Sequence, residues 1–206
     1  MPRKPVRSDG MATYTKLLNE IEAAFSKSNN ASVSLKDVAD AAQVPVASLY
    51  HFFPMPEAAL AALSERYIEL SAIEIMSNHV SDPERNWQGI INDIFDRGRE
   101  FYDKYPAAGK LRLTAHNSES TRYLILESNW ALAETIYSEL NRLFVLPETS
   151  GLVDDIARAI VISDALWSLS VSIHGAVTDE FAMEAERAVS LYLYPVLGPQ
   201  LTMIAE

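Results

Sequence analysis

The sequence contains no cysteine and only seven glycines among its 206 residues. Without cysteine the chain forms no disulfide and has no thiolate nucleophile, so a cytoplasmic location is the default expectation. Glycine-rich loops that cradle phosphates are correspondingly scarce, and the Walker A, G-x-G-x-x-G and G-x-S-x-G motifs do not occur. We therefore expect the chain to be no enzyme and to hold no cofactor.

Long apolar runs and metal-binding spacings are also missing. No uncharged apolar run approaches the roughly 18 residues of a transmembrane helix, so we expect no membrane partner. The basic N-terminus (Arg3, Lys4, Arg7) is not followed by the apolar segment of a secretory signal. None of the four histidines follows a glutamate by three positions, which disfavours a di-iron site, and we expect no metal.

The acidic charge is unevenly distributed along the chain. The formal net charge is −11, which by itself argues against nucleic-acid binding. Residues 1–60, however, carry six lysines and arginines against six aspartates and glutamates, so the excess acid lies after residue 60. Because physiological salt screens charges more than about 8 Å apart, a nucleic-acid-binding N-terminus is compatible with an acidic remainder.

Apolar spacing of three and four residues predicts an all-α protein of about nine helices. The first three are short, at about 13–28, 34–42 and 45–52, and Ser34 with Asp37 resembles a capping box at the start of the second. The tight turn between the second and third helices is typical of a helix-turn-helix, whose second helix enters the major groove of DNA.

The third helix, within VASLYHFFPMPEAAL, divides into two sides. Leu49 and Phe53 point back to hold it on the other helices, while Phe52 stays unassigned. On the outward side, small residues allow the backbone to approach base edges, and larger polar ones reach phosphates. Lys36 and His51 are equally compatible with plain solvent exposure. The predicted DNA-binding residues are Ser34, Lys36, Pro45, Val46, Ala47, Ser48, Tyr50 and His51.

Three segments resemble the N-terminal domain of the TetR family of bacterial transcription regulators. They are Ser34-Leu35-x-x-Val38-Ala39-x-x-Ala42-x-Val44, Ser48-Leu49-Tyr50-x-x-Phe53 and Pro56-Glu57-x-x-Leu60, within about residues 14–63. The resemblance implies a flexible basic arm (1–11), a helix-turn-helix domain (12–56) and a ligand-binding and dimerisation domain (57–206). The chain departs from the family at three positions: Gln43 replaces a turn glycine, Pro45 a Ser or Thr cap, and Pro56 a phosphate-binding lysine.

The rest of the chain is predicted to form a helical body. Helices are expected from Pro56 to about 81–83, from Trp87 to about Tyr105, over a short element at 107–117, and over 119–145, 152–174 and 179–197. The helix over 119–145 carries a stripe expected to point inward: Tyr123, Leu126, Trp130, Ala133, Tyr137, Leu140 and Phe144. The last two helices have more apolar surface than one contact needs, which indicates either a homodimer interface or a central place in a monomeric bundle.

Aromatic residues among the middle helices are candidates for a ligand cavity, although an aromatic stripe at helical spacing is more often part of a plain core. The candidate pocket residues are Phe95, Tyr102, His116, Tyr123, Asn129, Trp130 and Trp167. Together with the resemblance, they predict a repressor that binds a palindromic operator on double-stranded DNA as a homodimer and is released by an unknown small molecule. The alternative is a helical dimer that binds a ligand or partner and no longer recognises a specific operator.

Overall fold

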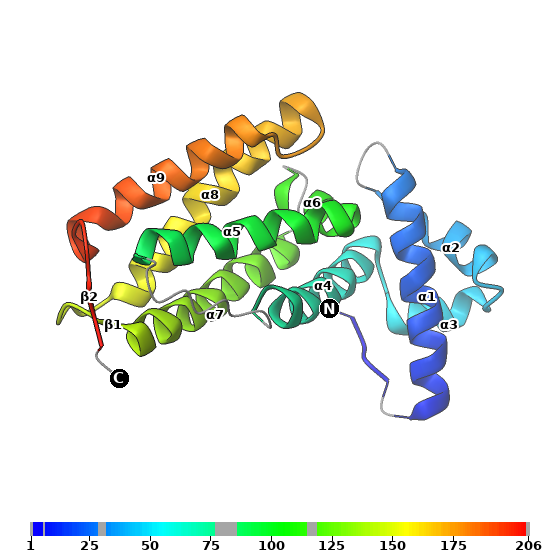
Figure 1. Ribbon diagram of the computed structural model, residues 1–206. Coiled ribbons are helices and arrows are strands. Elements are labelled where there is room, and N and C mark those ends of the chain that lie inside the picture. The colour runs from blue at the N-terminus through cyan, green and yellow to red at the C-terminus, as the bar shows by residue number, and fades with distance from the viewer. Residues whose placement is uncertain (1, 6, 29–31, 77–85, 115–118, 205–206) are drawn as a thin grey trace. The chain divides into compact units, whose positions relative to one another are not determined.

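The computed structural model describes residues 2–5, 7–28, 32–76, 86–114 and 119–204. Its described residues form nine α-helices and two short β-strands, which confirms the predicted all-α class (Figure 1). The elements are α1 Ser8–Lys27, α2 Leu35–Ala41, α3 Val46–Phe52, α4 Pro56–Met76, α5 Trp87–Lys104, α6 Pro106–Leu113, α7 Glu119–Leu143, β1 Phe144–Val145, α8 Leu152–His174, α9 Asp179–Leu197 and β2 Thr202–Met203.

The chain divides into two compact units. We call the first the head; it comprises Met1–Leu70, Tyr105–Arg112 and His116–Ile125. We call the second the body; it comprises Ser71–Lys104, Leu113–Ala115 and Leu126–Glu206.

The head contains the three predicted short helices. The buried face of α1 has the predicted composition: Tyr14, Leu17, Leu18, Ile21 and Phe25. The helix begins at Ser8, five residues before the predicted position, because its first turn is polar and carries Asp9, which favours a helix N-terminus without adding to the apolar pattern. Residues 8–11 of the predicted arm therefore belong to α1.

The turn between α2 and α3 is tight and strained. Ser34 caps α2 as predicted, since its Oγ accepts a hydrogen bond from the Asp37 amide at 3.4 Å. Gln43 has a φ of +51°, the left-handed region that costs a residue with a Cβ about 1–2 kcal/mol. Pro45 is the N-cap of α3 and lies just before its first turn, where the sequence had placed it inside the helix.

Lys110 fastens α6 to the C-terminal end of α1 within the head. Its Nζ donates to the carbonyl of Phe25 at 2.6 Å and to that of Ser28, and it lies 4.5 Å from the centre of the Phe25 ring. Burial lowers the pKa of this ammonium group. The Phe25 carbonyl also accepts from the Ser28 amide at 3.2 Å, so the ammonium group is a second donor to it. A cation at a helix C-terminus is favoured by the helix dipole.

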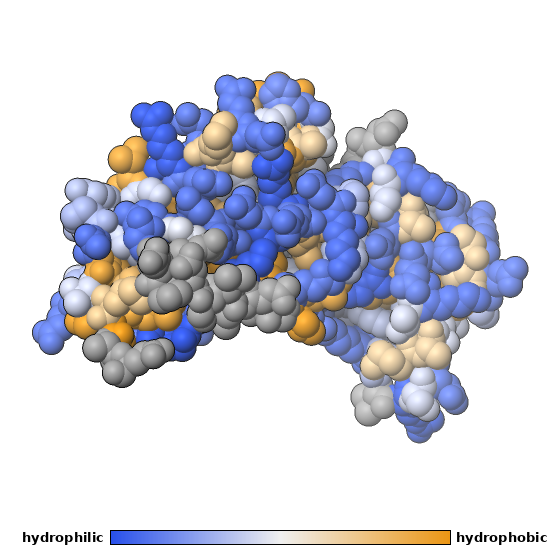
Figure 2. Space-filling model, in the orientation of Figure 1, coloured by the Kyte–Doolittle hydropathy of each residue, from blue (hydrophilic) through white to orange (hydrophobic). Residues whose placement is uncertain are grey.

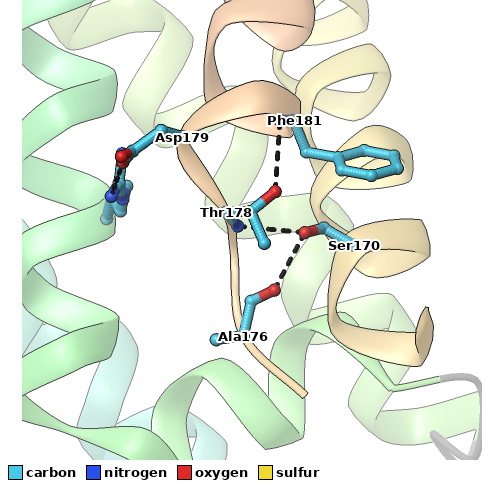
Figure 3. A network of polar contacts seen from close by, with 6 residues as sticks. Ser170, Ala176, Thr178, Asp179 and Phe181 are labelled. Atoms are coloured by element: carbon cyan, nitrogen blue, oxygen red, sulfur yellow. Dashed lines mark hydrogen bonds and ion pairs between the residues drawn. The ribbon is translucent and has the colours of Figure 1, made fainter. Parts of the chain in front are cut away.

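In the body, α8 and α9 lie side by side and the turn between them is closed by hydrogen bonds (Figures 1 and 3). Ser170 Oγ donates to the Ala176 carbonyl at 2.8 Å and accepts from the Thr178 amide at 3.0 Å. Thr178 in turn caps α9 by accepting from the Phe181 amide. Because Ser170 is fully buried, these bonds satisfy a hydroxyl that would otherwise destabilise the turn.

The N-terminal end of α5 is tied to the chain after α9, also within the body. Trp87 Nε1 donates to the carbonyl of Gly198 at 3.1 Å, and Gln88 Nε2 donates to that of Pro199 at 3.3 Å. Gly198 follows α9 with a φ of +71°, a conformation that glycine adopts without strain.

Two expectations about α7 and its surroundings are wrong. The predicted helix over 119–145 ends at Leu143, and Phe144 and Val145 pair with Met203 and Thr202 as an antiparallel ladder that the sequence did not predict. Strands of two residues are too short to show the alternation of apolar and polar residues that identifies a strand in a sequence. The first half of the predicted inward stripe is exposed: Tyr123 by 58%, Trp130 by 40%, and Leu126 similarly.

By length and composition alone, α8 is apolar enough to cross a membrane. The core helix of a water-soluble protein passes the same test, and α8 packs against α9 along one face. For α4, the predicted end near 81–83 lies outside the described residues, because the described helix stops at Met76.

Candidate functional site

The outward side of α3 and the start of α2 form the candidate nucleic-acid interface. Five of the eight predicted residues lie exposed on or beside α3 and Ser48 is half-buried there, while the other two lie exposed at the start of α2. We call this set the reading surface: Ser34, Lys36, Pro45, Val46, Ala47, Ser48, Tyr50 and His51. None of these side chains is buried in the core, so all are placed where a duplex could reach them.

The inward side of α3 is an aromatic anchor. Leu49 and Phe53 are fully buried, as predicted. Phe52, unassigned from the sequence, is also buried, and its ring stands edge-on to that of Tyr14 at 5.7 Å between centroids. Phe53 lies 5.0 Å from the same Tyr14 ring. Burying large aromatic rings contributes several kcal/mol, so a helix of only seven residues is held in one orientation.

Formal positive charge is scarce near the reading surface. No lysine or arginine occurs between Lys36 and Arg66 in the sequence. Arg66 is engaged within the head, since its guanidinium donates to Asn19 at 2.7 Å and pairs with Glu22. Pro56 occupies the first position of α4, where the resemblance placed a phosphate-binding lysine, and it offers neither a positive charge nor a backbone N–H. The next amides of that helix end, those of Ala58 and Ala59, donate to the Met55 carbonyl.

Three of the seven candidate ligand residues are in contact with one another. Phe95, Tyr102 and Trp167 form an aromatic cluster in the body between α5 and α8, with both smaller rings edge-on to the indole at 6.1 and 5.9 Å. Trp167 is buried, and its Nε1 has no hydrogen-bond partner among the described residues. An unpaired buried N–H costs about 1–3 kcal/mol, which a ligand acceptor would recover.

The other described pocket candidates belong to α7. Asn129 is buried on α7, whereas Tyr123 and Trp130 are exposed, and the Trp130 indole donates to Asp154 at 2.8 Å. His116 lies outside the described residues.

Two polar residues of α5 were missed by the sequence interpretation. The side-chain oxygens of Gln88 and Asn92 are buried without a partner in the part of the chain that the structure describes. Positions 88, 92, 95 and 102 are separated by four, three and seven residues, so Gln88 and Asn92 lie on the same face of α5 as Phe95 and Tyr102. This spacing could have identified the two polar residues from the sequence. Within the described residues, no group of three or more acidic or histidine side chains could hold a metal ion.

Comparison with known proteins places the fold. No family model and no curated protein sequence matches the chain. A TetR-family transcriptional regulator from Streptomyces coelicolor superimposes with a TM-score of 0.69 over 90% of this chain and 99% of its own, at 20% identity. A TetR transcriptional regulator from Rhodococcus sp. RHA1 gives a TM-score of 0.64 at 16% identity, covering 90% and 98%.

A third similar structure is the multidrug binding protein EbrR complexed with imidazole, at a TM-score of 0.64 and 18% identity, covering 92% of this chain and 96% of that one. The chain therefore has the all-α fold of TetR-family transcriptional regulators over nine-tenths of its length, and the resemblance stated from the motifs is confirmed at the level of fold.

Proposed function

We propose that the protein is a DNA-binding transcription regulator whose reading surface enters the major groove. The observation that carries this proposal is the division of α3: its apolar side is anchored on Tyr14, and its small and polar side is exposed. The N-terminal half of α3, with Val46 and Ala47 exposed and Ser48 half-buried, suits close approach to base edges, and Tyr50 and His51 suit phosphate contact. The proposed site of action is the cytoplasm.

The active species is proposed to be a homodimer joined through α8 and α9. Large apolar side chains stay exposed along both helices, and the face shown in Figure 2 has apolar and polar residues intermixed over α9. The exposed apolar residues of the two helices are Val161, Leu169, Ile173, Met183, Leu191 and Tyr194. A two-fold pair of heads would match a palindromic operator.

We propose that a small molecule bound beside Phe95, Tyr102 and Trp167 releases the operator, which makes the protein a repressor. The unpaired indole N–H of Trp167 supports this placement. It favours an aromatic ligand that carries a hydrogen-bond acceptor.

The deciding experiment is selection of bound fragments from genomic DNA, followed by affinity measurements at about 0.1 M salt on the selected duplex and on a random one. Specific binding by a regulator exceeds its non-specific binding by about 10³-fold or more. Equal affinity for both duplexes would favour the alternative, a ligand-binding or partner-binding dimer without an operator.

Tyr50→Ala tests the reading surface directly. Loss of a hydrogen bond to a charged phosphate should weaken operator binding by roughly tenfold or more, while the exposed position leaves folding and assembly unchanged. Tyr50→Phe keeps the ring and removes only the hydroxyl, so it separates hydrogen bonding from packing. Unchanged affinity for both variants would remove Tyr50 from the DNA surface.

A further inference from the structure

We propose that Arg3 binds the DNA backbone and supplies the phosphate-binding cation that the reading helix lacks. This inference rests on the proposed DNA-binding function. It concerns the N-terminal segment, residues 2–5, which the sequence alone placed in a flexible arm.

The need for such a cation follows from the charges around α3. The helix VASLYHF contains no lysine or arginine, and neither do the flanking residues up to Arg66, which is committed to Glu22. Duplex binding gains much of its affinity from the counterions released when basic side chains neutralise phosphates. The reading surface has one lysine, Lys36 at the start of α2, so a cation held at the end of α3 would add a phosphate contact that this helix does not make itself.

The N-terminal segment is the part of the head that brings a basic residue to the end of this helix. The backbone N–H of Arg3 donates to the carbonyl of Phe52 at 2.9 Å. Phe52 is the last residue of α3 and directly follows Tyr50 and His51 of the reading surface. The Arg3 side chain is exposed, and within the described residues it forms no ion pair, so its charge is available to a ligand.

The neighbouring lysine has a different role. Lys4 Nζ lies 3.0 Å from a carboxylate oxygen of Glu65 and 3.7 Å from one of Glu69, both on α4. The hydrogen bond to Glu65 raises the pKa of Lys4. Its charge is thus balanced inside the head, and Lys4 acts as an anchor for the segment.

A third contact comes from Pro5 and Gly10. A Cβ placed on Gly10 would lie only 2.9 Å from the Pro5 Cβ, so glycine at this position permits the close approach of the segment to α1. With Arg3, Lys4 and Pro5 each held, the segment is largely ordered before DNA arrives. Because the segment is already ordered, it loses less conformational entropy on binding DNA than a free tail would.

The test is the salt dependence of duplex binding by the full-length chain, measured by fluorescence anisotropy between 50 and 200 mM salt. Arg3→Gln is compared with the wild type, with the charge-conserving Arg3→Lys, and with Arg7→Gln. Arg7 is also exposed, but it is the N-cap of α1, and its carbonyl accepts from the Met11 amide in the first turn of that helix. Each protein is measured on the selected operator duplex and on a random duplex.

For Arg3→Gln we expect the slope of log K against log salt to fall by about 0.9 per protomer on both duplexes. Arg3→Lys should keep the wild-type slope, and Arg7→Gln should change it by much less than Arg3→Gln. The preference for operator over random DNA should survive in Arg3→Gln, because a phosphate contact carries no sequence information. Circular dichroism should show unchanged folding, since only an exposed side chain is altered.

An unchanged slope for Arg3→Gln, or an equal loss for Arg7→Gln, overturns the assignment of Arg3. A wild type that binds operator and random duplexes equally overturns the proposed operator recognition instead, and the slopes on random DNA still decide the role of Arg3. A wild type that binds no duplex overturns both.

Discussion

The head and the body place their apolar residues differently. In the head, the predicted inward residues of α1 and α3 are buried almost completely, and the outward side of α3 carries small or polar groups. In the body, α8 and α9 pack on each other and still leave large apolar side chains exposed, Leu191 by 64%. Because the head buries the apolar residues of α1 and α3 within one chain, the surface that α3 leaves open suits a polar partner such as DNA. The exposed apolar faces of α8 and α9 are instead suited to being covered by protein.

The largest expected effect concerns the anchor of the head. Phe53→Ala removes a fully buried ring that packs 5.0 Å from Tyr14, so we expect a loss of about 3–5 kcal/mol in the free energy of unfolding of the head. Urea denaturation with a probe in the head measures this loss. Met55→Ala, at a half-exposed position two residues on, should stay within about 0.5 kcal/mol of the wild type. A loss below 1 kcal/mol for Phe53→Ala would contradict the anchor.

The next effect concerns the apolar faces of the body. Leu191→Glu places a charge on α9 that would have to be buried in the proposed dimer, so we expect the dimer dissociation constant to rise at least about 30-fold, or about 2 kcal/mol. Val145→Glu adds the same charge at an equally exposed apolar residue of β1 and should leave the dimer intact. Sedimentation equilibrium distinguishes the two. A dimer unaffected by Leu191→Glu would move the interface away from this part of α9.

The comparison also explains which parts of the fold were predictable. In the head, the predictions depend on local chemistry, such as the Ser34 cap and the spacing from Leu49 to Phe53, and they are confirmed. In α7, helical spacing correctly identified residues on one face but could not tell which face the rest of the chain would cover. Trp130 shows the physical reason, because its indole N–H finds a partner in Asp154 while the ring stays partly in solvent.

The candidate sites show the same contrast between features set by neighbouring residues and features set by distant ones. The residues of the reading surface lie together because they belong to one short motif, whereas the aromatic cluster needed α5 and α8 to meet. Sequence spacing alone carried no information on that meeting, nor on the pairing of Phe144 with Met203 from the far end of the chain. The contact of Arg3 with Phe52 is equally non-local.

A smaller effect tests the strained turn of the head. Gln43→Gly should stabilise the head by about 0.5–1 kcal/mol, because glycine avoids the Cβ penalty at the left-handed φ of +51° and offsets part of that gain by losing more backbone entropy on folding. Ala41→Gly, two residues earlier inside α2, should instead destabilise it by a similar amount. Thermal or urea unfolding of the two variants measures the expected gain and the expected loss in the free energy of unfolding. A destabilised Gln43→Gly would mean that the Gln43 side chain contributes more than the strain costs.

The smallest effect lies in the body and depends on pH. Partial burial, reinforced by Asp96 and opposed by Arg99, raises the pKa of Glu186 on α9. The folded state therefore binds this proton more tightly than the unfolded chain does, where the pKa is about 4.3. The resulting stability is fully present below that pKa and is lost as pH rises through the raised folded value.

Glu186→Gln removes this titration. The variant should match the wild type near pH 4 and exceed its stability at pH 7 by a few tenths of a kcal/mol, a small gain because solvent screens the half-exposed side chain. Glu184→Gln, two residues earlier on α9, removes an exposed carboxylate and is the matched control for the substitution itself. An equal stability of wild type and Glu186→Gln at both pH values would contradict the burial of this carboxylate.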